Sequence, residues 1–281
     1  MRTIARQEID FTALYTQCRN QRRFEARARL GIAQAAALEA AQQYRALGLD
    51  MTLYQFVHPQ IPEGGANAED FVGLYNYSFA RKNGAGRWAY DKIKASAPHG
   101  ICPLCGQRPV STLDHYLPKE SKWMLAITPD NLIPACTDCN FAKRAACPQD
   151  EATQSFHPYF DSADESQWLF AQLRRVGGGL FVSFFVRDPE DWTPPRRQRA
   201  RHHFTVLGLE SFYKTQAAEE LANMKYRLTR LLKQGGAGTV TAHLREVAAS
   251  YRSNHTNSWQ TALYDALAQD AGFCAGDFSL V

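Results

Sequence analysis

The chain contains Cys102-Pro-Leu-Cys105-Gly106, then Thr112-Leu-Asp114-His115-Tyr116-Leu-Pro118-Lys119, then Asn131-Leu-Ile-Pro134-Ala-Cys136-Thr-Asp-Cys139-Asn140, with Lys143 soon after. Two Cys-x-x-Cys pairs therefore frame an adjacent Asp and His and two asparagines. No other part of the sequence is as dense in groups that bind metals or transfer protons.

The two cysteine pairs predict a structural zinc site. Cys102, Cys105, Cys136 and Cys139 offer four soft ligands at the chelating spacing that tetrahedral zinc prefers. Because all four positions are filled by protein sulfur, this zinc is expected to hold the fold together and not to catalyse. The separation between Cys105 and Cys136 is longer than the spacing of a plain zinc ribbon. Something is therefore inserted between the two pairs.

The inserted segment carries the groups suited to catalysis. Residues 110–117 resemble a short strand that ends in Asp114 and His115. A carboxylate is a hard oxygen ligand suited to Mg²⁺ or Mn²⁺, and an imidazole can take a proton from water near neutral pH. Neighbours in a strand face opposite sides, so the strand must end or bulge if both serve one site. Residues 136–143 are expected to begin a helix that places Asn140 and Lys143 on much the same face.

Composition indicates an ordinary globular protein. The 281 residues are 45% hydrophobic and 21% charged, with a formal net charge of +4. This charge is compatible with a polyanionic partner without proving one. Basic residues gather at 19–29, which contain five arginines against one glutamate, and at 196–203. No signal peptide or membrane span is expected. Together with unpaired cysteines outside the two pairs, this predicts a soluble cytoplasmic protein.

The remaining chain is mainly helical by pattern, which predicts an α+β fold. The expected elements are a helical segment over 5–48 stopping near Gly48, a loop over 59–68, helices over 69–80 and 88–97, a β-hairpin of 168–176 and 180–186 around a glycine turn at 177–179, and helices over 196–269 broken at Gly235–Gly238. Three regions are predicted, namely helical residues 1–97, a zinc-stabilised core over 98–150, and a hairpin with C-terminal helices over 151–281.

The motifs of the central stretch resemble those of the HNH endonucleases, which have the ββα-metal or His-Me finger fold. The resemblance covers about residues 98–147 and rests on Asp-His, Asn-Leu-x-Pro and Cys-x-x-Cys-Asn-x-x-Lys behind an upstream Cys-x-x-Cys. The runs Leu113–Lys119 and Phe156–Asp161 are also similar to HNH proteins of bacterial antiphage systems. Among these, the motifs resemble the nuclease subunit of Septu-type systems, which acts with an ATPase and also occurs with some retrons.

The resemblance implies a role for each motif residue. His115 is the general base that activates water, Asp114 binds the catalytic metal, and Asn131 fixes the loop that aligns the base. Asn140 stands where many members have a second His and gives an oxygen to Mg²⁺ or Mn²⁺. The basic residues nearby are candidates for DNA phosphate contacts, with solvated surface charge as an equal alternative. These basic residues are Lys119, Lys122, Lys143 and Arg144.

Three functions are compatible with the sequence. The resemblance favours a metal-dependent endonuclease acting on DNA, and a partner protein, an ATPase among the candidates, is expected to dock on the helical flanks. The alternatives are a zinc-stabilised binding module without catalysis and a nuclease toxin that cleaves RNA. His157 is expected in a packed aromatic turn, and His202 and His203 in a basic helix start or an interaction surface, without catalytic roles.

Overall fold

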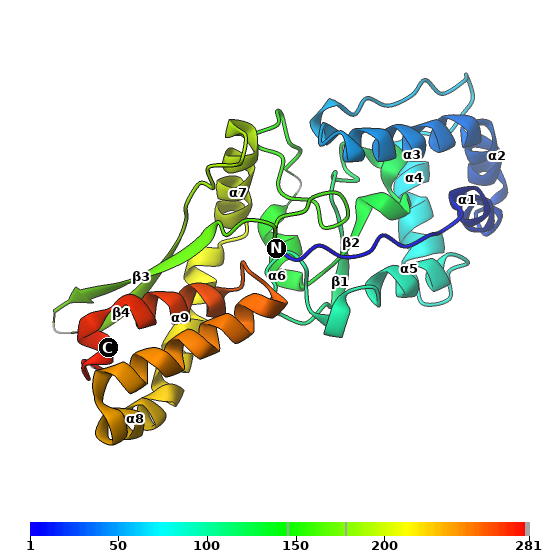
Figure 1. The fold of residues 1–281 in the computed structure, drawn as a ribbon. Coiled ribbons are helices and arrows are strands. Elements are labelled where there is room, and N and C mark those ends of the chain that lie inside the picture. The colour runs from blue at the N-terminus through cyan, green and yellow to red at the C-terminus, as the bar shows by residue number, and fades with distance from the viewer. Residues whose placement is uncertain (145, 178, 279–281) are drawn as a thin grey trace. The chain divides into compact units, whose positions relative to one another are not determined.

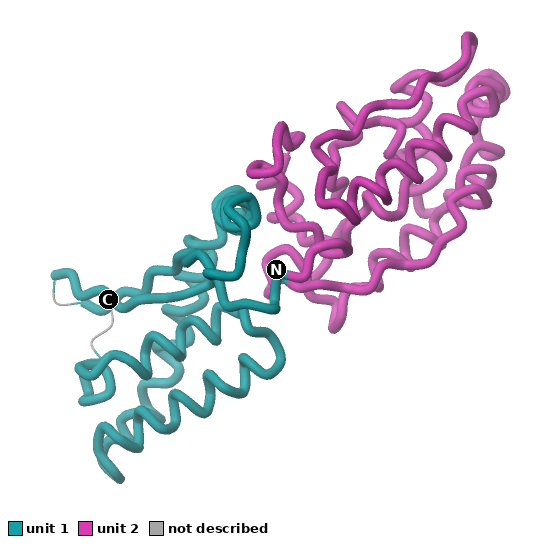
Figure 2. Tube along the Cα trace, turned by 45° about the horizontal axis from the view of Figure 1, so that its top comes forward, with its two compact units in different colours: residues 1, 163–281 teal, residues 2–162 magenta. Residues whose placement is uncertain are grey.

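The computed structural model describes residues 1–144, 146–177 and 179–278. Residue 178 of the predicted glycine turn, residue 145 of the predicted core and residues 279–281 of the predicted C-terminal region lie outside the described residues. The chain folds into two compact units, shown in Figure 2. Unit 1 contains Met1 and residues 163–281, and unit 2 contains residues 2–162. The predicted regions 1–97 and 98–150 both lie within unit 2, apart from Met1.

Unit 2 consists of short helices around one pair of strands. Its helices are α1 (Phe11–Asn20), α2 (Phe24–Ile32), α3 (Gln34–Leu49), α4 (Ala68–Leu74), α5 (Arg87–Lys94) and α6 (Thr137–Lys143), with a π-helical turn η2 (Tyr75–Phe79) and 3₁₀ turns η1 (Leu53–Gln55), η3 (Pro98–Gly100), η4 (Trp123–Leu125) and η5 (Pro129–Asn131). Strands β1 (Thr112–His115) and β2 (Leu132–Ala135) pair antiparallel, with His115 opposite Leu132. Helix α6 follows β2 directly and packs on β1 (Figure 1). These three elements make a ββα unit.

The prediction of one helical segment over 5–48 was wrong in its start and its continuity. Residues 1–10 are not helical, and Ile4 N–H donates to the carbonyl of Pro158 at 3.0 Å. Helix α1 begins only after Asp10, whose side chain accepts hydrogen bonds from the N–H groups of Thr12 and Ala13. An N-cap of this kind sets the start of a helix because it satisfies donors that have no partner within it.

Gly48 has a packing role that the sequence did not reveal. Helix α3 continues to Leu49, one residue past the predicted stop. A Cβ atom at residue 48 would lie 2.4 Å from the ring of Phe160, so only glycine lets that ring pack against the helix. The aromatic turn at 156–161 is thereby held against α3.

Unit 1 combines a β-hairpin with long helices. Its strands are β3 (Leu169–Val176) and β4 (Gly179–Val186), and its helices are α7 (Pro194–Val206), α8 (Leu209–Asn254), α9 (Trp259–Gln269) and α10 (Ala271–Cys274). The hairpin is paired from Leu169 with Val186 to Val176 with Gly179. Helix α8 packs on β4 and α9 packs on β3. The predicted hairpin and helices are confirmed, and the fold is α+β and mostly helical.

The predicted break in the C-terminal helices is also confirmed. Helix α8 has non-helical backbone angles at Gly235 and at Gly236, where φ is 67°. Glycine adopts such an angle without the steric cost that a Cβ imposes. Figure 1 shows the chain turning back between the yellow first arm and the orange second arm of α8. No helix in the described part of the chain combines the length and the apolar character needed to cross a bilayer.

Candidate metal centre and cleft

The four paired cysteines come together in space. The sulfur atoms of Cys102, Cys105, Cys136 and Cys139 all lie within 4.8 Å of one another, and all four residues are buried. A tetrahedral zinc with Zn–S bonds of about 2.3 Å requires sulfurs about 3.8 Å apart, so a small rearrangement at most would complete the site. Within the described residues this is the one group of three or more His, Cys, Asp or Glu side chains placed to share a metal ion.

The backbone around the cluster is shaped to hold thiolates. The N–H of Arg108 donates to Cys105 Sγ at 3.5 Å, and the N–H of Cys139 donates to Cys136 Sγ at 3.4 Å. Hydrogen bonds of this kind favour the ionised sulfur that a metal needs. Four thiolates this close would repel one another, so all four sulfurs can ionise together only around a cation. The donor set and its surroundings fit a structural zinc.

The cluster fixes the start of α6 against the first cysteine pair. Cys136 is the N-cap residue of α6, and Cys139 lies in its first turn. The same helix carries Asn140 and Lys143, so a metal at the cysteines would also set the position of these two side chains. Cys18 and Cys274 are buried apart from the cluster, and Cys147 is half-buried.

A second feature of unit 2 is a cleft of about 420 Å³ beside the ββα unit. The sequence predicted five of its lining residues as site residues, whereas Pro118, Glu120, Thr137 and Phe141 were not singled out. The predicted five are Asp114, His115, Lys119, Asn140 and Arg144. The end of β1, the segment that follows it and α6 therefore converge on one hollow.

His115 is the last residue of β1, and its ring is held from two sides. Its Nε2 lies 2.9 Å from the backbone carbonyl of Ala126, and the Tyr75 ring meets it edge-on at 4.5 Å between centroids. A carbonyl oxygen only accepts hydrogen bonds, so Nε2 must carry the hydrogen and Nδ1 the lone pair. Among the described residues, no hydrogen-bond partner occupies Nδ1. Neither Ala126 nor Tyr75 has a signature in the sequence that reveals this contact.

The burial of His115 keeps its imidazole neutral. Loss of solvation, assisted by the positive charges of Lys119 and Lys143, lowers the pKa of His115 to about 3. Near neutral pH the ring is therefore an unprotonated base. An anion entering the cleft would favour the imidazolium form and raise this pKa.

This pKa makes a prediction about stability. Unfolded His115 binds a proton below its ordinary pKa of 6.5, whereas the folded state resists until about pH 3. The contribution of His115 to the free energy of unfolding is thus fully present above pH 6.5 and is lost as the pH falls towards 3. Between pH 7 and pH 5 the free energy of unfolding should fall by up to about 2 kcal/mol more in wild type than in His115→Asn. Urea unfolding at both pH values measures this, and equal pH dependence in the two proteins would contradict it.

Asp114 is buried and paired with a lysine. Lys143 Nζ lies 2.8 Å from Asp114 Oδ2 and 2.6 Å from the carbonyl oxygen of His115. Burial raises the pKa of Asp114, while the charge of Lys143 opposes that rise. Among the described residues, Asp114 Oδ1 receives no hydrogen bond. Lys143, a candidate for a phosphate contact by sequence, is therefore the buried counter-charge of Asp114 and is not among the residues that line the cleft.

Asn131 lies outside the cleft and ties together the segments that surround it. Its Oδ1 accepts from the N–H of Leu117 at 2.7 Å, and its Nδ2 donates to the carbonyls of Leu117 at 3.0 Å and of Leu125 at 3.3 Å. Leu117 follows the base by two residues, and Leu125 precedes the carbonyl that holds the base. This fully buried side chain is thus placed to align His115 from both directions.

The structure separates the remaining candidates. Lys119 and Arg144 reach the cleft, with Lys119 paired to Glu120 at 2.9 Å and Arg144 over the exposed ring of Phe141. Lys122 turns away and donates to the carbonyl of Phe56. His157 is buried among aromatic rings with its Nε2 3.0 Å from the hydroxyl of Tyr44. His202 and His203 lie on α7 in unit 1.

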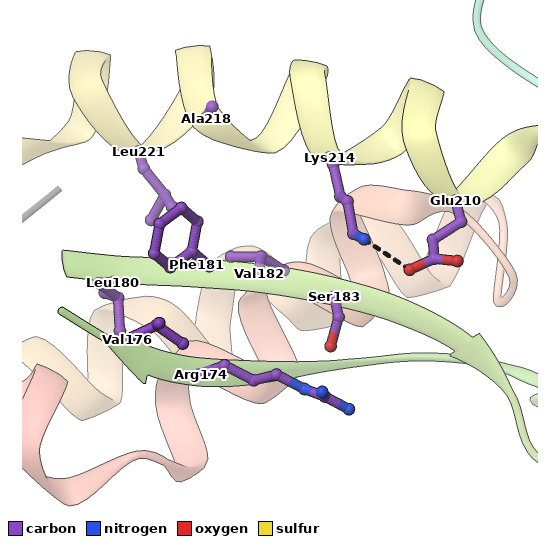
Figure 3. Close-up of a pocket in the computed structure, with 10 residues that line it drawn as sticks. All are labelled: Arg174, Val176, Leu180, Phe181, Val182, Ser183, Glu210, Lys214, Ala218 and Leu221. Carbon is purple, nitrogen blue, oxygen red and sulfur yellow. Dashed lines mark ion pairs between the residues drawn. The ribbon is translucent and has the colours of Figure 1, made fainter. Parts of the chain in front are cut away.

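Unit 1 has a pocket of different character between the hairpin and α8, with a volume of about 360 Å³ (Figure 3). Phe181 and Val182 of β4 and Leu221 of α8 give it apolar walls on two sides, and Lys214 and Glu210 form an ion pair of 2.6 Å at one end. None of its lining residues is a His, Cys or Asp. Most of its lining is apolar, and its charged groups are Arg174, Glu210 and Lys214.

Comparison with known proteins identifies a relative in a bacteriophage. The chain is a homologue of protein ea31 of Escherichia phage lambda, with 28% identity over 261 residues that cover 85% of this chain and 87% of ea31. Unit 2 comprises residues 2–162, and unit 1, with Met1 and residues 163–281, contains fewer residues. Neither unit alone is long enough to contain this match, so the similarity extends into both. No family model and no solved structure matches the chain.

Proposed function

We propose that this protein is a metal-dependent endonuclease of the HNH type that hydrolyses phosphodiester bonds in DNA. The observation that supports it most is the convergence of Asp114, His115 and Asn140 on one cleft of a ββα unit that also carries a four-cysteine cluster. An imidazole base, hard oxygen ligands and a basic rim are the groups that phosphodiester hydrolysis needs.

In this proposal His115 acts as the general base. Its Nε2–H is held by the carbonyl of Ala126, which leaves the Nδ1 lone pair to take a proton from the attacking water. Its lowered pKa keeps it unprotonated before substrate arrives. The scissile phosphate then stabilises the imidazolium that forms.

Asp114 and Asn140 are the residues that would hold a catalytic Mg²⁺ or Mn²⁺. Both line the cleft, and both offer the hard oxygen donors these ions prefer. When bound there, such an ion would supply positive charge to offset the negative charge that develops during hydrolysis. Lys119 and Arg144 at the rim would orient the phosphate by charge, and Lys143 would keep Asp114 ionised and in place.

The nuclease proposal is tested by nicking of supercoiled plasmid DNA in Mg²⁺. His115→Asn removes the base while retaining a side-chain amide that can donate to Ala126, so the rate is expected to fall by at least about 10²-fold. The matched control is His99→Asn, an exposed histidine of the same unit whose φ of 57° suits asparagine.

Three outcomes would contradict the proposal. Wild type that nicks no DNA in Mg²⁺ or Mn²⁺, alone or with a co-purifying protein, would favour a binding module without catalysis. Equal nicking rates for wild type and His115→Asn would show that His115 is not the general base. Cleavage of RNA in place of DNA under the same conditions would favour the toxin alternative.

A partner protein, an ATPase in particular, and a role in phage defence are further proposals that rest on the resemblance of the motifs. The relative ea31 is encoded by a phage, so that similarity does not favour a defence role over others. Isolation of the chain from its native host as an active monomer would contradict the partner proposal.

A further inference from the structure

The five arginines of residues 19–29 have different interaction partners in the structure. Arg29 is consumed by two hydrogen bonds of 2.7 Å to Asp70, and Arg19 bonds the side chain of Gln34 at 2.7 Å. Arg27 lies over the ring of Phe24. Arg22 and Arg23, in the turn between α1 and α2, instead line one hollow together with Arg81, which belongs to a loop far later in the sequence.

These residues line a hollow of about 530 Å³ in unit 2, the arginine cleft, formed by Gln21, Arg22, Arg23, Tyr77 and Arg81. It contains three guanidinium groups and no carboxylate. Among the described residues, no carboxylate forms an ion pair with any of these three guanidinium groups. The Arg22 guanidinium stacks on the Tyr77 ring at 4.9 Å, and its Nε is buried without a hydrogen-bond partner.

The arginine cleft is held in shape before any ligand arrives. The Gln21 side chain donates to the carbonyl of Asn83 at 3.0 Å and accepts from the N–H of Ala85 at 2.7 Å. The loop that carries Arg81 is thereby fastened to the end of α1. A Cβ at Gly84 would lie 2.3 Å from the carbonyl oxygen of Ser78, so the loop also requires glycine there. A pre-formed site loses little conformational entropy on binding.

The chemistry of the arginine cleft favours a phosphate ligand. No carboxylate forms an ion pair with these three described guanidinium groups, although the Asp70 carboxylate, which is paired with Arg29, also attracts Arg22. The three like charges repel one another, and an anion between them relieves that repulsion. Guanidinium forks match phosphate oxygens in a two-point geometry. The exposed rings of Tyr77 and Phe24 and the exposed Lys82 lie in the same segments, and aromatic and basic side chains together are typical of nucleic-acid surfaces.

The π-helical turn η2 connects this cleft to the proposed catalytic site. Tyr75 of η2 contacts the His115 ring, while Tyr77 two residues later supports Arg22. Both sites therefore belong to one packed unit. We propose that the arginine cleft binds the phosphodiester backbone of the DNA substrate away from the scissile phosphate. The identity of the ligand as DNA rests on the proposed function.

The test measures DNA binding in the His115→Asn background, where the proposed chemistry is removed. A labelled DNA duplex is titrated by fluorescence anisotropy in Mg²⁺ at several salt concentrations. Arg22→Gln, Arg23→Gln and Arg81→Gln together should lower affinity at least about tenfold and reduce the slope of log K against log salt by about 2 to 3, since each lost phosphate contact removes about 0.9. The exposed single changes Arg23→Gln and Arg81→Gln should each reduce it by about 1.

A matched triple change removes the same charge from unit 1. Lys225, Arg227 and Arg230 are exposed on α8, and their replacement by Gln should leave affinity and slope near those of the parent. An equal loss in this control would assign the effect to net charge and overturn the inference. So would unchanged slopes in both single variants, or displacement of DNA by poly-glutamate at equal charge, which would indicate an acidic protein ligand.

The two proposals fail separately. If DNA binds through the arginine cleft but the wild type nicks no plasmid, the nuclease proposal fails and the inference about the arginine cleft stands. If nicking depends on His115 but changes in the arginine cleft leave DNA binding unaffected, the nuclease proposal stands and the inference about the arginine cleft fails.

Discussion

Replacing Cys136 by serine is expected to release zinc from the protein and to unfold the ββα unit. Cys136 lies both in the four-sulfur cluster and at the N-cap of α6. Structural zinc contributes about 10–16 kcal/mol to folding in small zinc domains, which is as large as the whole stability of many proteins. Wild type should contain one zinc ion per chain by elemental analysis, and Cys136→Ser should contain far less and melt at a lower temperature.

Cys147→Ser is the matched control for this change. Cys147 is half-buried and lies outside the cluster, so its replacement should leave both zinc content and melting temperature near those of wild type. Full zinc content in Cys136→Ser would show that the cluster is not the zinc site. Removing zinc from wild type with a chelator should reproduce the Cys136→Ser melting curve, because α6 then loses its attachment to the first cysteine pair.

Lys143→Met is expected to destabilise the protein by about 3–5 kcal/mol, because it leaves the carboxylate of Asp114 buried without its counter-charge. Both side chains are buried, and their nitrogen and oxygen lie 2.8 Å apart. Adding Asp114→Asn to Lys143→Met removes the unpaired charge and should restore much of the lost stability. Urea unfolding of wild type, Lys143→Met, Asp114→Asn and the double variant gives the coupling free energy between Asp114 and Lys143.

The pH dependence of Lys143→Met provides a second check with a defined sign. Burial already raises the pKa of Asp114, and loss of Lys143 removes two interactions that lower it. A carboxyl whose folded pKa lies above its unfolded value binds the proton more tightly when folded, so stability rises as the pH falls. Lys143→Met should therefore gain stability relative to wild type between pH 7 and pH 5. A constant difference would show that Asp114 is not the group left unpaired.

The cysteine cluster and the cleft are linked through α6. One short helix carries Cys139, Asn140 and Lys143, so it contacts the cluster, lines the cleft and neutralises Asp114. A disturbance at the cysteines is therefore expected to reach the cleft.

Local chemistry in the sequence determined the cysteine cluster, the strand that ends in Asp114 and His115, the hairpin of unit 1 and the break at Gly235–Gly236. Each depends on residue type at short spacing, where backbone geometry leaves few alternatives. The late start of the first helix was missed because a cap such as Asp10 and the contact of Ile4 with Pro158 do not alter hydrophobic periodicity.

Only the tertiary structure decided which charges are used internally and which remain available. Lys143 and Lys122 have the same side chain, yet one lies buried against Asp114 and the other donates to Phe56. Arg29 forms an ion pair with Asp70, whereas Arg22 lines a hollow with Arg81, which comes from a distant part of the sequence. A side chain's partner depends on which distant segment packs beside it. The residue type at one position therefore predicts the chemistry of its side chain, and only the packing of the chain decides which partner that side chain contacts.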